Sequence, residues 1–278
     1  MTTLPESFQL PGLDGKVAVI TGGGGAICGA IAKAMAERGV RVAIWDLSEE
    51  NAQRIADQIN SAGGKAVAVQ CDVTDRQNVY AATQATVEAF GTIDLLVNGA
   101  GGGYKKATTA PDLSFFDVEP DEVMKAMALN YRTAVVPSQA VGRVFAEAEA
   151  GVVVNIASIA GLKPLTRSFG YSNGKAAVVS FTEWLAVHMA KEYSTAIRVN
   201  AIAPGFIVTD QNRFILENPK TGELSERGEE VVRQVPMARF GKPEEMAGAV
   251  LWLASDAATF VTGAVIPVDG GYNAFGGV

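Results

Sequence analysis

The sequence predicts an α/β fold built on one doubly wound parallel sheet of about seven strands, with helices on both faces. Short apolar runs alternate with longer amphipathic stretches over most of the chain, which is typical of repeated strand–helix units. The apolar runs are nearly continuous, as expected for strands that helices cover on both faces. No linker-like change in composition interrupts residues 1–278, so we expect a single domain.

The first half of the chain contains three strand–helix pairs and a fourth strand. KVAVIT is apolar and followed by a segment with helical spacing that ends at Gly39, a residue common after helix ends. RVAIWD and KAVAVQCD each precede a more polar helical segment, and TIDLLVNGAG runs into glycines. The strands are expected at 16–21, 41–46, 65–72 and 92–101, with helices at 26–39, up to about 62 and up to 90.

The second half supplies the remaining strands. GVVVNIAS, AIRVNAIAPG and AVIPVDGG are apolar runs of strand length, and right-handed crossovers would place the helices between strands on both faces of the sheet. The strands are expected at 151–158, 196–205 and 264–271, with helices around 121–148 and at 172–193.

Two stretches, 103–119 and 210–240, do not fit the regular alternation. Both follow strands, and therefore belong to the edge at which such sheets bind ligands. Loops of this length are usually functional or disordered. For 210–240, a mobile lid over the substrate and a rigid insertion for contacts between subunits both remain open.

Charge and composition restrict the class of protein. A net charge of -7 and the lack of a basic tract argue against a nucleic-acid binder. Cys28 and Cys71 form no disulfide framework, so a cytoplasmic protein is expected. The first residues have no charged n-region or apolar h-region, so we expect no secretion signal there, and the apolar runs are so short and broken that we expect none to span a membrane. With one histidine and two cysteines, we expect no metal site.

A glycine cluster, TGGGGAICG at 21–29, joins the first strand to the first helix. Glycines in this position let the backbone approach a pyrophosphate, whose charge the helix N-terminus favours. The alternative is a merely flexible turn. The position directly after the first strand favours a dinucleotide site of the Rossmann type.

Two aspartates follow neighbouring strands. Asp46 ends the second strand, where a carboxylate can bind both ribose hydroxyls of the adenosine half and repel a 2′-phosphate. We therefore expect NAD rather than NADP, while a helix N-cap, which Ser48 also offers, is the alternative. Asp72 could meet the adenine edge, or cap the helix that begins near Asp75.

Tyr171, Lys175 and Ser158 are the strongest candidates for chemistry. A phenol normally loses its proton near pH ~10. Lys175 follows Tyr171 by four residues, on the same face of a helix, and its ammonium is expected to lower the tyrosine pKa. The Ser158 hydroxyl can donate a hydrogen bond to a carbonyl oxygen. Together these groups suit proton transfer between an alcohol and a ketone.

Together these motifs resemble the short-chain dehydrogenase/reductase family over nearly the whole chain. The motifs that carry the resemblance are the glycine loop at 21–29, Asp46, Asp72, NGAG at 98–101, Asn130, Ser158, Tyr171 with Lys175, Pro204-Gly205 and Asp269-Gly270-Gly271.

The resemblance implies a role for each of the matching residues. Tyr171 would be the general acid/base, Ser158 would orient the substrate oxygen, and Lys175 would bind the nicotinamide ribose and lower the tyrosine pKa. Asn130 would hold a water that links Lys175 to solvent. The cofactor would contact Gly22, Gly25, Ala26, Ile27, Asp46, Leu47, Asp72, Val73, Asn98, Ala100, Gly101, Tyr171, Lys175, Pro204, Gly205, Ile207 and Thr209.

The chain departs from the family pattern near the cofactor. Ala26 and Cys28 stand where the family usually has glycine, and Gly99 replaces the second Asn of NNAG. Gly29 is expected to relieve crowding by Cys28. The Cys28 thiol could be a redox group, but a small buried hydrophobe is the safer interpretation.

Within the family, the chain resembles the D-mannonate oxidoreductase, or fructuronate reductase, branch. This likeness rests on stretches such as LPESF, PLTR at 164–167, APGFIVTDQNR at 203–213 and PMARFGKPEE. A sugar acid needs a partner for its carboxylate, which an arginine can bind with two hydrogen bonds. The candidates for substrate contacts are Arg167, Arg213, Lys106, Gln211 and Asn212.

Three functions are carried forward. The first is an NAD-dependent oxidoreductase of a sugar acid such as D-mannonate or D-fructuronate. The second is a dehydrogenase of another polyol or keto-sugar, similar to gluconate 5-dehydrogenases. The third is a nucleotide-binding protein without turnover.

Aromatic residues bear on packing and assembly. We expect Trp45, Trp184 and Trp252 to be packing anchors, and His188 to lie on a helix that packs in the core or against a subunit. In the family the corresponding helix commonly pairs with its twin, so the resemblance implies a homodimer or homotetramer.

Overall fold

Seven strands form one sheet in the order β3-β2-β1-β4-β5-β6-β7, and every neighbouring pair is parallel. The computed structural model describes residues 10–209, 212–218 and 221–277. The expected doubly wound parallel sheet is confirmed. The strands are β1 (Val17–Thr21), β2 (Arg41–Asp46), β3 (Lys65–Gln70), β4 (Leu95–Asn98), β5 (Gly151–Ile156), β6 (Ile197–Pro204) and β7 (Val265–Val268).

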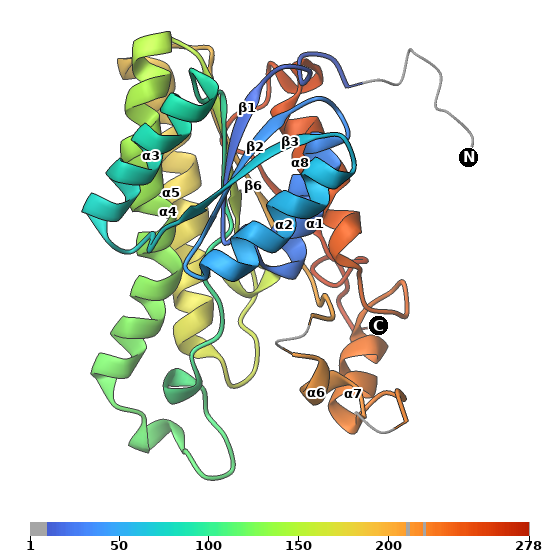
Figure 1. Cartoon of the computed structure of the whole chain (residues 1–278). Helices are drawn as coiled ribbons and strands as arrows, with labels where there is room; N and C mark the ends of the chain where they lie inside the picture. Colours follow the sequence, from blue (N-terminus) through green and yellow to red (C-terminus); the bar gives the residue numbers. More distant parts are fainter. Residues whose placement is uncertain (1–9, 210–211, 219–220, 278) are drawn as a thin grey trace.

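Helices cover both faces of the sheet (Figure 1). Helices α1, α2 and α8 lie on one face, and α3, α4 and α5 lie on the other. Each face has its own apolar core, in which buried Val, Ile, Leu and Ala side chains of the strands meet the inward sides of these helices. The helices are α1 (Ala26–Ala36), α2 (Glu49–Ser61), α3 (Arg76–Phe90), α4 (Pro120–Ala148), α5 (Phe169–Glu192) and α8 (Ala247–Ala254).

Several element boundaries differ from those expected. Strands β3, β4, β5 and β7 end two to three residues early, at Gln70, Asn98, Ile156 and Val268, because the chain turns there to form the ligand edge. Helix α5 starts at Phe169 instead of 172, so Tyr171 lies inside its first turn.

The strand order reverses between β1 and β4, which opens a crevice at the carboxyl ends of these strands. The register places Thr21 of β1 opposite Asn98 of β4, and Asn98 opposite Asn155 of β5. The Thr21 hydroxyl accepts hydrogen bonds from Gly99 N (3.0 Å) and Ala100 N (3.2 Å). The loops that leave β1 and β4 are thereby tied together at the crevice.

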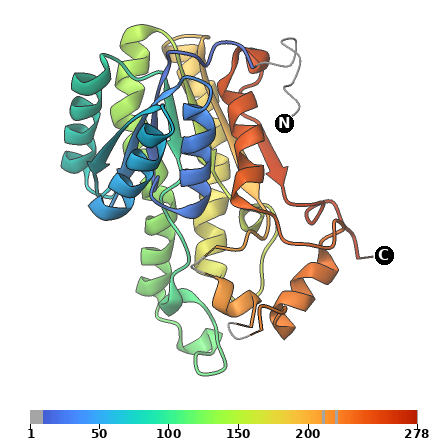
Figure 2. The same cartoon turned by 45° about the vertical axis from the view of Figure 1, so that its right-hand side comes forward.

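Both stretches outside the alternation extend beyond this edge, as Figures 1 and 2 show. They are less irregular than expected. The stretch 103–119 holds two 3₁₀ turns, η2 (Lys105–Ala107) and η3 (Phe115–Asp117), and 210–240 holds α6 (Arg213–Leu216) and α7 (Glu226–Gln234). Ser225 is the N-cap of α7, and its hydroxyl accepts a hydrogen bond from Gly228 N (3.0 Å), with Glu226 and Glu229 in the first turn of the helix.

The tryptophans divide into two kinds. Trp45 is fully buried and donates a hydrogen bond from Nε1 to Thr86 Oγ1 (3.0 Å), as expected of an anchor. Trp184 contradicts the expectation, because 58% of it is exposed. Helix α5 turns Phe181 and Leu185 inward, which leaves Trp184 on the outer side, where its ring stacks on His188 at 4.8 Å. In the described part of the chain, no helix is long and apolar enough to cross a membrane.

The first helix packs against the end of β4 through an unusual pair. A Cβ atom on Gly99 would lie 2.0 Å from the Cys28 sulfur, so the sulfur occupies the space of a side chain at position 99. The expectation that Gly29 makes room for Cys28 was wrong, because Gly29 faces Ile55 of α2, with 3.0 Å between its added Cβ and Ile55 Cδ1. The two departures from the family pattern, Cys28 and Gly99, therefore compensate each other.

This pairing makes a prediction for stability. Gly99→Ala should lower the free energy of unfolding by about 1–3 kcal/mol through overpacking, and Cys28→Ala in the same chain should restore most of the loss. Urea unfolding of the two single variants and the double variant measures the coupling. Additive losses in the double variant would show that the sulfur and position 99 do not compete for space.

Candidate active site

Tyr171, Ser158 and Lys175 come together where α5 meets the end of β5. The Ser158 hydroxyl, which accepts a hydrogen bond from Ala160 N (3.1 Å), is hydrogen-bonded to the Tyr171 phenol. The Lys175 Nζ lies 5.9 Å from the centre of the Tyr171 ring and donates a hydrogen bond to Ile156 O (2.8 Å). The predicted spacing of four residues thus brings the cation and the phenol to one site.

Two glycines allow this part of α5 to be approached closely. A Cβ atom on Gly161 would lie 2.7 Å from the backbone of Lys175, so the loop after Ser158 rests directly on the helix. On the other side, a Cβ on Gly174 would lie 2.9 Å from the Asn130 Cβ. Helix α4 and the 158–161 loop therefore enclose the turn that carries the lysine.

Burial sets the protonation of both groups. Burial raises the pKa of the Tyr171 phenol above its usual value, and the hydrogen bond with Ser158 lowers it only in part. Burial lowers the pKa of Lys175 to about 8, so the ammonium is still mostly charged at pH 7. The expectation of a lowered tyrosine pKa was wrong for the protein alone, because burial raises the pKa of Tyr171.

Asn130 holds in place the short loop 100–102 that follows β4, here called the strap. Its Nδ2 donates to Gly102 O (2.9 Å) and Ala126 O (3.0 Å), and its Oδ1 accepts from Gly102 N (3.1 Å). Gly101 has a φ of 139°, and an added Cβ would lie 2.8 Å from Asn130 Oδ1. Asn130 of α4 contacts Gly174, the residue before Lys175 in α5, which agrees with the expected place of Asn130 near the lysine. The water that would link Lys175 to solvent stays a prediction.

The glycine loop fits a dinucleotide pyrophosphate. Gly22 approaches the strap so closely that an added Cβ would lie 2.9 Å from Ala100 Cα, and its φ is 63°. Gly25 caps α1 without a side-chain hydrogen bond, and Gly25 and Ala26 are exposed at the start of that helix. The first backbone N–H groups of α1 are thus available to an anion.

Asp46, at the end of β2, binds the glycine loop and does not cap a helix. Its Oδ2 accepts a hydrogen bond from Gly24 N (3.0 Å), and its Oδ1 accepts one from Ser48 N (2.9 Å). Ser48 is the residue that caps α2, through a hydrogen bond from Asn51 N to its Oγ (3.3 Å). Leu47, between the two, is 68% exposed. The alternative of Asp46 as an N-cap is therefore excluded.

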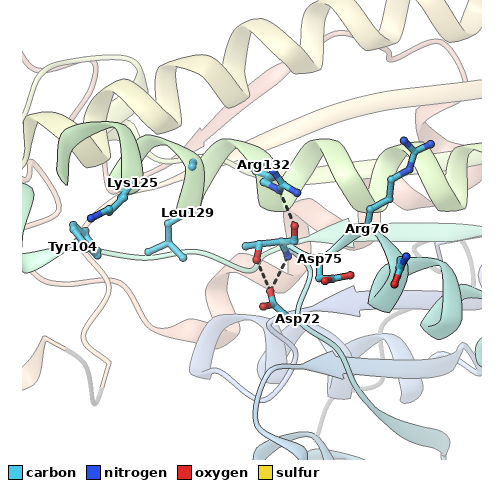
Figure 3. Close-up of a pocket in the computed structure, with 10 residues that line it drawn as sticks. Asp72, Asp75, Arg76, Tyr104, Lys125, Leu129 and Arg132 are labelled. Atoms are coloured by element: carbon cyan, nitrogen blue, oxygen red, sulfur yellow. Dashed lines mark hydrogen bonds between the residues drawn. The ribbon is translucent and has the colours of Figure 1, made fainter. Parts of the chain in front are cut away.

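The turn after β3 forms one wall of a hollow of ≈ 760 Å³ between the start of α3 and α4 (Figure 3). Asp72 Oδ1 accepts hydrogen bonds from Thr74 N (2.9 Å) and Thr74 Oγ1 (2.7 Å), while Asp75 is the N-cap of α3. Asp72 is thus not the cap, and its contact with adenine stays a prediction. Arg132 of α4 donates from Nε to Thr74 O (2.7 Å) and holds this turn against the helix.

The Asn98 side chain is committed to the interior. Its Nδ2 donates to Asn155 Oδ1 (2.9 Å) and Ser138 Oγ (3.0 Å). Asn155 in turn donates to Thr182 Oγ1 of α5 (2.8 Å). This buried amide row aligns α5 with β4 and β5, so a role for Asn98 at the cofactor would use its backbone.

The segment after β6 is closed by one amide. Asn212 Oδ1 accepts a hydrogen bond from Thr209 N (2.8 Å), and its Nδ2 donates to Ile207 O (2.8 Å). Gly205 lies against the chain after β7, with 2.7 Å between an added Cβ and Asp269 Cα. The side chain of Asn212, predicted to meet the substrate, thus holds the turn that carries Thr209.

Both insertions clasp the residues that precede Tyr171. Thr109 N donates to Arg167 O (3.0 Å), and the rings of Phe115 and Phe169 make an edge contact at 5.6 Å. From the other side, Arg227 of α7 donates to Thr166 Oγ1 (3.1 Å). The mouth of the site is therefore framed by 103–119 and by α7.

The predicted substrate residues differ in their surroundings. Arg167 is exposed, has a φ of 73°, and its guanidinium is bonded to no other side chain of the described residues. Arg213 is paired with Glu217 at 2.5 Å. Lys106 lies in η2 and is exposed, and Gln211 lies outside the described residues.

The sequence arguments missed several residues that shape the site. Arg54 of α2 donates from Nη2 to Gly24 O (2.8 Å), although no basic residue lies in the glycine loop itself. Thr133 donates from Oγ1 to Ala100 O (3.0 Å) and holds the strap on α4. Helical spacing from Asn130 to Thr133 could have indicated the second contact, whereas no local pattern indicates the first.

Known proteins match this chain over almost its full length. A family model described as enoyl-(acyl carrier protein) reductase matches residues 24–273. UxuB of Bacillus subtilis (strain 168), an uncharacterised oxidoreductase, is 40% identical over 275 residues, which are 96% of this chain and 98% of UxuB. D-threitol dehydrogenase of Mycolicibacterium smegmatis is 36% identical over 260 residues, which are 94% of each chain.

Solved structures match in fold as well as in sequence. A Haemophilus influenza protein provisionally described as a D-mannonate oxidoreductase, with bound NAD, has a TM-score of 0.89, 37% identity, and coverage of 96% of this chain and 98% of its own. A provisional gluconate 5-dehydrogenase from Beutenbergia cavernae, with NADP at low occupancy, has a TM-score of 0.83, 32% identity, and coverage of 95% and 98%. The chain belongs to the short-chain dehydrogenase/reductase family, and is a nicotinamide-dependent enzyme that interconverts hydroxyl and keto groups.

Proposed function

We propose that this enzyme uses NAD(H) to interconvert a sugar-acid alcohol and its ketone, with D-mannonate and D-fructuronate as the preferred pair. The observation that carries the proposal is the cluster of Ser158, Tyr171 and Lys175 beside the crevice of the sheet. The choice of sugar acid draws on the Haemophilus influenza relative, described as a D-mannonate oxidoreductase.

Tyr171 is the proposed proton donor and acceptor. The bound nicotinamide supplies the hydride acceptor or donor. In reduction, the Tyr171 phenol gives its proton to the carbonyl oxygen of the substrate, and in oxidation the phenolate takes the proton of the hydroxyl. Ser158 orients the substrate oxygen, because its hydroxyl lies beside the Tyr171 phenol and can donate its proton to that oxygen once substrate binds.

Lys175 and Asn130 are proposed to assist transfer of the Tyr171 proton. The buried ammonium of Lys175 favours the phenolate of Tyr171 once substrate and cofactor exclude water from the site. Asn130 keeps the strap 100–102 in place beside this turn of α5, and we assign to it the water link that would return protons from solvent.

NAD is the proposed cofactor in preference to NADP. The Asp46 carboxylate, held by Gly24 N and Ser48 N, stands at the end of β2, where it can accept hydrogen bonds from ribose hydroxyls. The same charge would repel a 2′-phosphate.

Arg167 is the proposed partner of the substrate carboxylate. It lies four residues before Tyr171, at the clasped mouth of the site, and its guanidinium is not used by another described side chain. Arg213 is a weaker candidate because Glu217 already neutralises it. Lys106 would meet substrate hydroxyls from the facing insertion.

A polyol dehydrogenase is the second candidate within the same enzyme class. It is favoured by the likeness to D-threitol dehydrogenase, whose name implies a substrate without a carboxylate. The exposed site of Arg167 is the feature that favours the sugar acid over this alternative.

We also propose assembly into a homodimer or homotetramer through the outer side of α5. Trp184, Val187 and Tyr193 are 58%, 58% and 55% exposed there. The rings of Trp184 and Tyr193 join those of Phe181 and His188 in one row of contacts. A second copy would cover this apolar surface.

The first functional prediction concerns the proton donor. Tyr171→Phe should lower kcat about 10²–10⁴-fold in the oxidation of D-mannonate, because the proton has no carrier. NADH affinity, measured by fluorescence, should stay unchanged. Tyr193→Phe on the same helix, with its exposed ring, is the matched control. Undiminished turnover in Tyr171→Phe would remove this residue from the chemistry, and absence of turnover in the native enzyme on any alcohol would favour a nucleotide-binding protein.

The second concerns the carboxylate. Arg167→Met should lower kcat/KM for D-mannonate by about tenfold or more, as expected for the loss of a hydrogen bond to a charged group, and leave the kcat/KM for an uncharged polyol unchanged. Arg213→Met should have the smaller effect, because Glu217 holds that side chain. Equal losses on charged and uncharged substrates, or a native enzyme indifferent to the carboxylate, would favour the polyol dehydrogenase.

A further inference from the structure

The backbone N–H and carbonyl of Gly24 are bound by two side chains of opposite charge. Its N–H donates to Asp46 Oδ2 (3.0 Å), and its carbonyl accepts a hydrogen bond from Arg54 Nη2 (2.8 Å). Asp46 ends β2, and Arg54 lies in the second turn of α2. The carboxylate and the guanidinium therefore meet the glycine loop at the same residue.

Gly24 also packs closely against α2. A Cβ atom on Gly24 would lie 2.6 Å from the Asn51 Cβ and 2.9 Å from Asp46 Oδ2. Gly24 thus rests on the first turn of α2 without space for any side chain. The glycine loop and α2 are therefore in direct contact at this residue, beside Arg54.

Arg54 is the cation of this region. No other Lys or Arg side chain donates a hydrogen bond to loop residues 22–25 in the part of the chain that the structure describes. A guanidinium has five N–H donors, and the contact with Gly24 O uses one of them. The remaining donors suit a phosphate, which arginine binds with two parallel hydrogen bonds.

Three carboxylates lie in the same region as Arg54. Asp46 binds the same glycine, and Glu49 and Glu50 are exposed in the first turn of α2. A 2′-phosphate, with a charge near −2 at pH 7, would be attracted by one cation and repelled by these three groups. A ribose with two free hydroxyls is not subject to this repulsion.

We propose that Arg54 is a specificity-determining residue that binds the adenosine 2′-phosphate, and that Asp46 conceals its effect. The proposal rests on the proposed dinucleotide site at the glycine loop. Of these three carboxylates, Asp46 is the one that binds the glycine loop, so it contributes most to the exclusion of the phosphate, although the arginine that would bind the phosphate is already in position. Removal of the Asp46 charge turns the same loop into a site for NADPH.

A double-mutant cycle tests this proposal without substrate. The variants are Asp46→Asn, which keeps an acceptor for Gly24 N, Arg54→Met, which keeps the aliphatic stem, and the two combined. Fluorescence titration gives the Kd of NADH and of NADPH for each. Asp46→Asn should bind NADPH at least about tenfold more tightly than the native enzyme, the change expected from one charged hydrogen-bond partner. The combined variant should lose most of this gain and keep only the part that comes from the removed repulsion.

Two further variants secure the interpretation. Arg54→Lys with Asp46→Asn should keep part of the gain, because a cation remains at position 54. This variant replaces Arg54→Met in the test if Arg54→Met fails to fold. Arg38→Met is the matched control, since Arg38 is an exposed arginine that donates to Ala34 O (3.0 Å), far from the loop. Its Kd values should equal those of the native enzyme.

The outcomes are distinguishable from those for the proposed reaction. An Asp46→Asn gain that persists in full without the Arg54 cation would overturn the proposal, as would no gain at all. A native enzyme that prefers NADPH would contradict the proposed NAD preference, and Arg54→Met alone would then test the arginine through a loss of NADPH affinity. A wrong choice of sugar acid would leave all these affinities unchanged.

Discussion

The active site depends on one buried cation, the ammonium of Lys175. Lys175 is 5% exposed, and its ammonium donates to Ile156 O at the end of β5. A buried charge with few partners is costly, so the surrounding structure must hold it in one place. Gly161 and Gly174 do so by letting a loop and a helix close on its turn of α5. Tyr171, one helical turn away, is partly buried beside it.

The rest of the molecule serves this turn in two ways. On the cofactor side, Thr21 and Asn130 tie the glycine loop and the strap after β4 to neighbouring elements, so the crevice is formed before a dinucleotide arrives. On the substrate side, 103–119 and α7 hold the residues that precede Tyr171, through Thr109 and Arg227. The proton site is thus positioned between two surfaces with separate tasks, and substrate choice can vary without disturbing the cofactor crevice.

Local pattern predicted the sheet and the proximity of Tyr171 to Lys175, because strand burial and helical spacing depend on nearby residues in sequence. The effect of one on the other could not be predicted, since the tyrosine pKa depends on burial, which is a property of the whole fold. The same limit applies to Cys28 and Gly99, which are 71 positions apart and compensate only once α1 packs on β4. It also applies to Arg54, whose contact with the glycine loop depends on how α2 lies.

The central claim is that Tyr171 is a buried phenol that keeps its proton in the protein alone and ionises when oxidised cofactor binds. Its pKa is raised by burial, so the phenol form persists as pH rises through the range in which a hydrated tyrosine would begin to ionise. The positive charge of oxidised nicotinamide should reverse this shift. Ultraviolet titration of the native enzyme minus Tyr171→Phe, with and without NAD⁺, measures the ionisation directly. We expect phenolate absorbance from Tyr171 to develop at lower pH with NAD⁺ than without it. The same titration curve in both states, or a phenolate already present near pH 7 in the protein alone, would contradict the account.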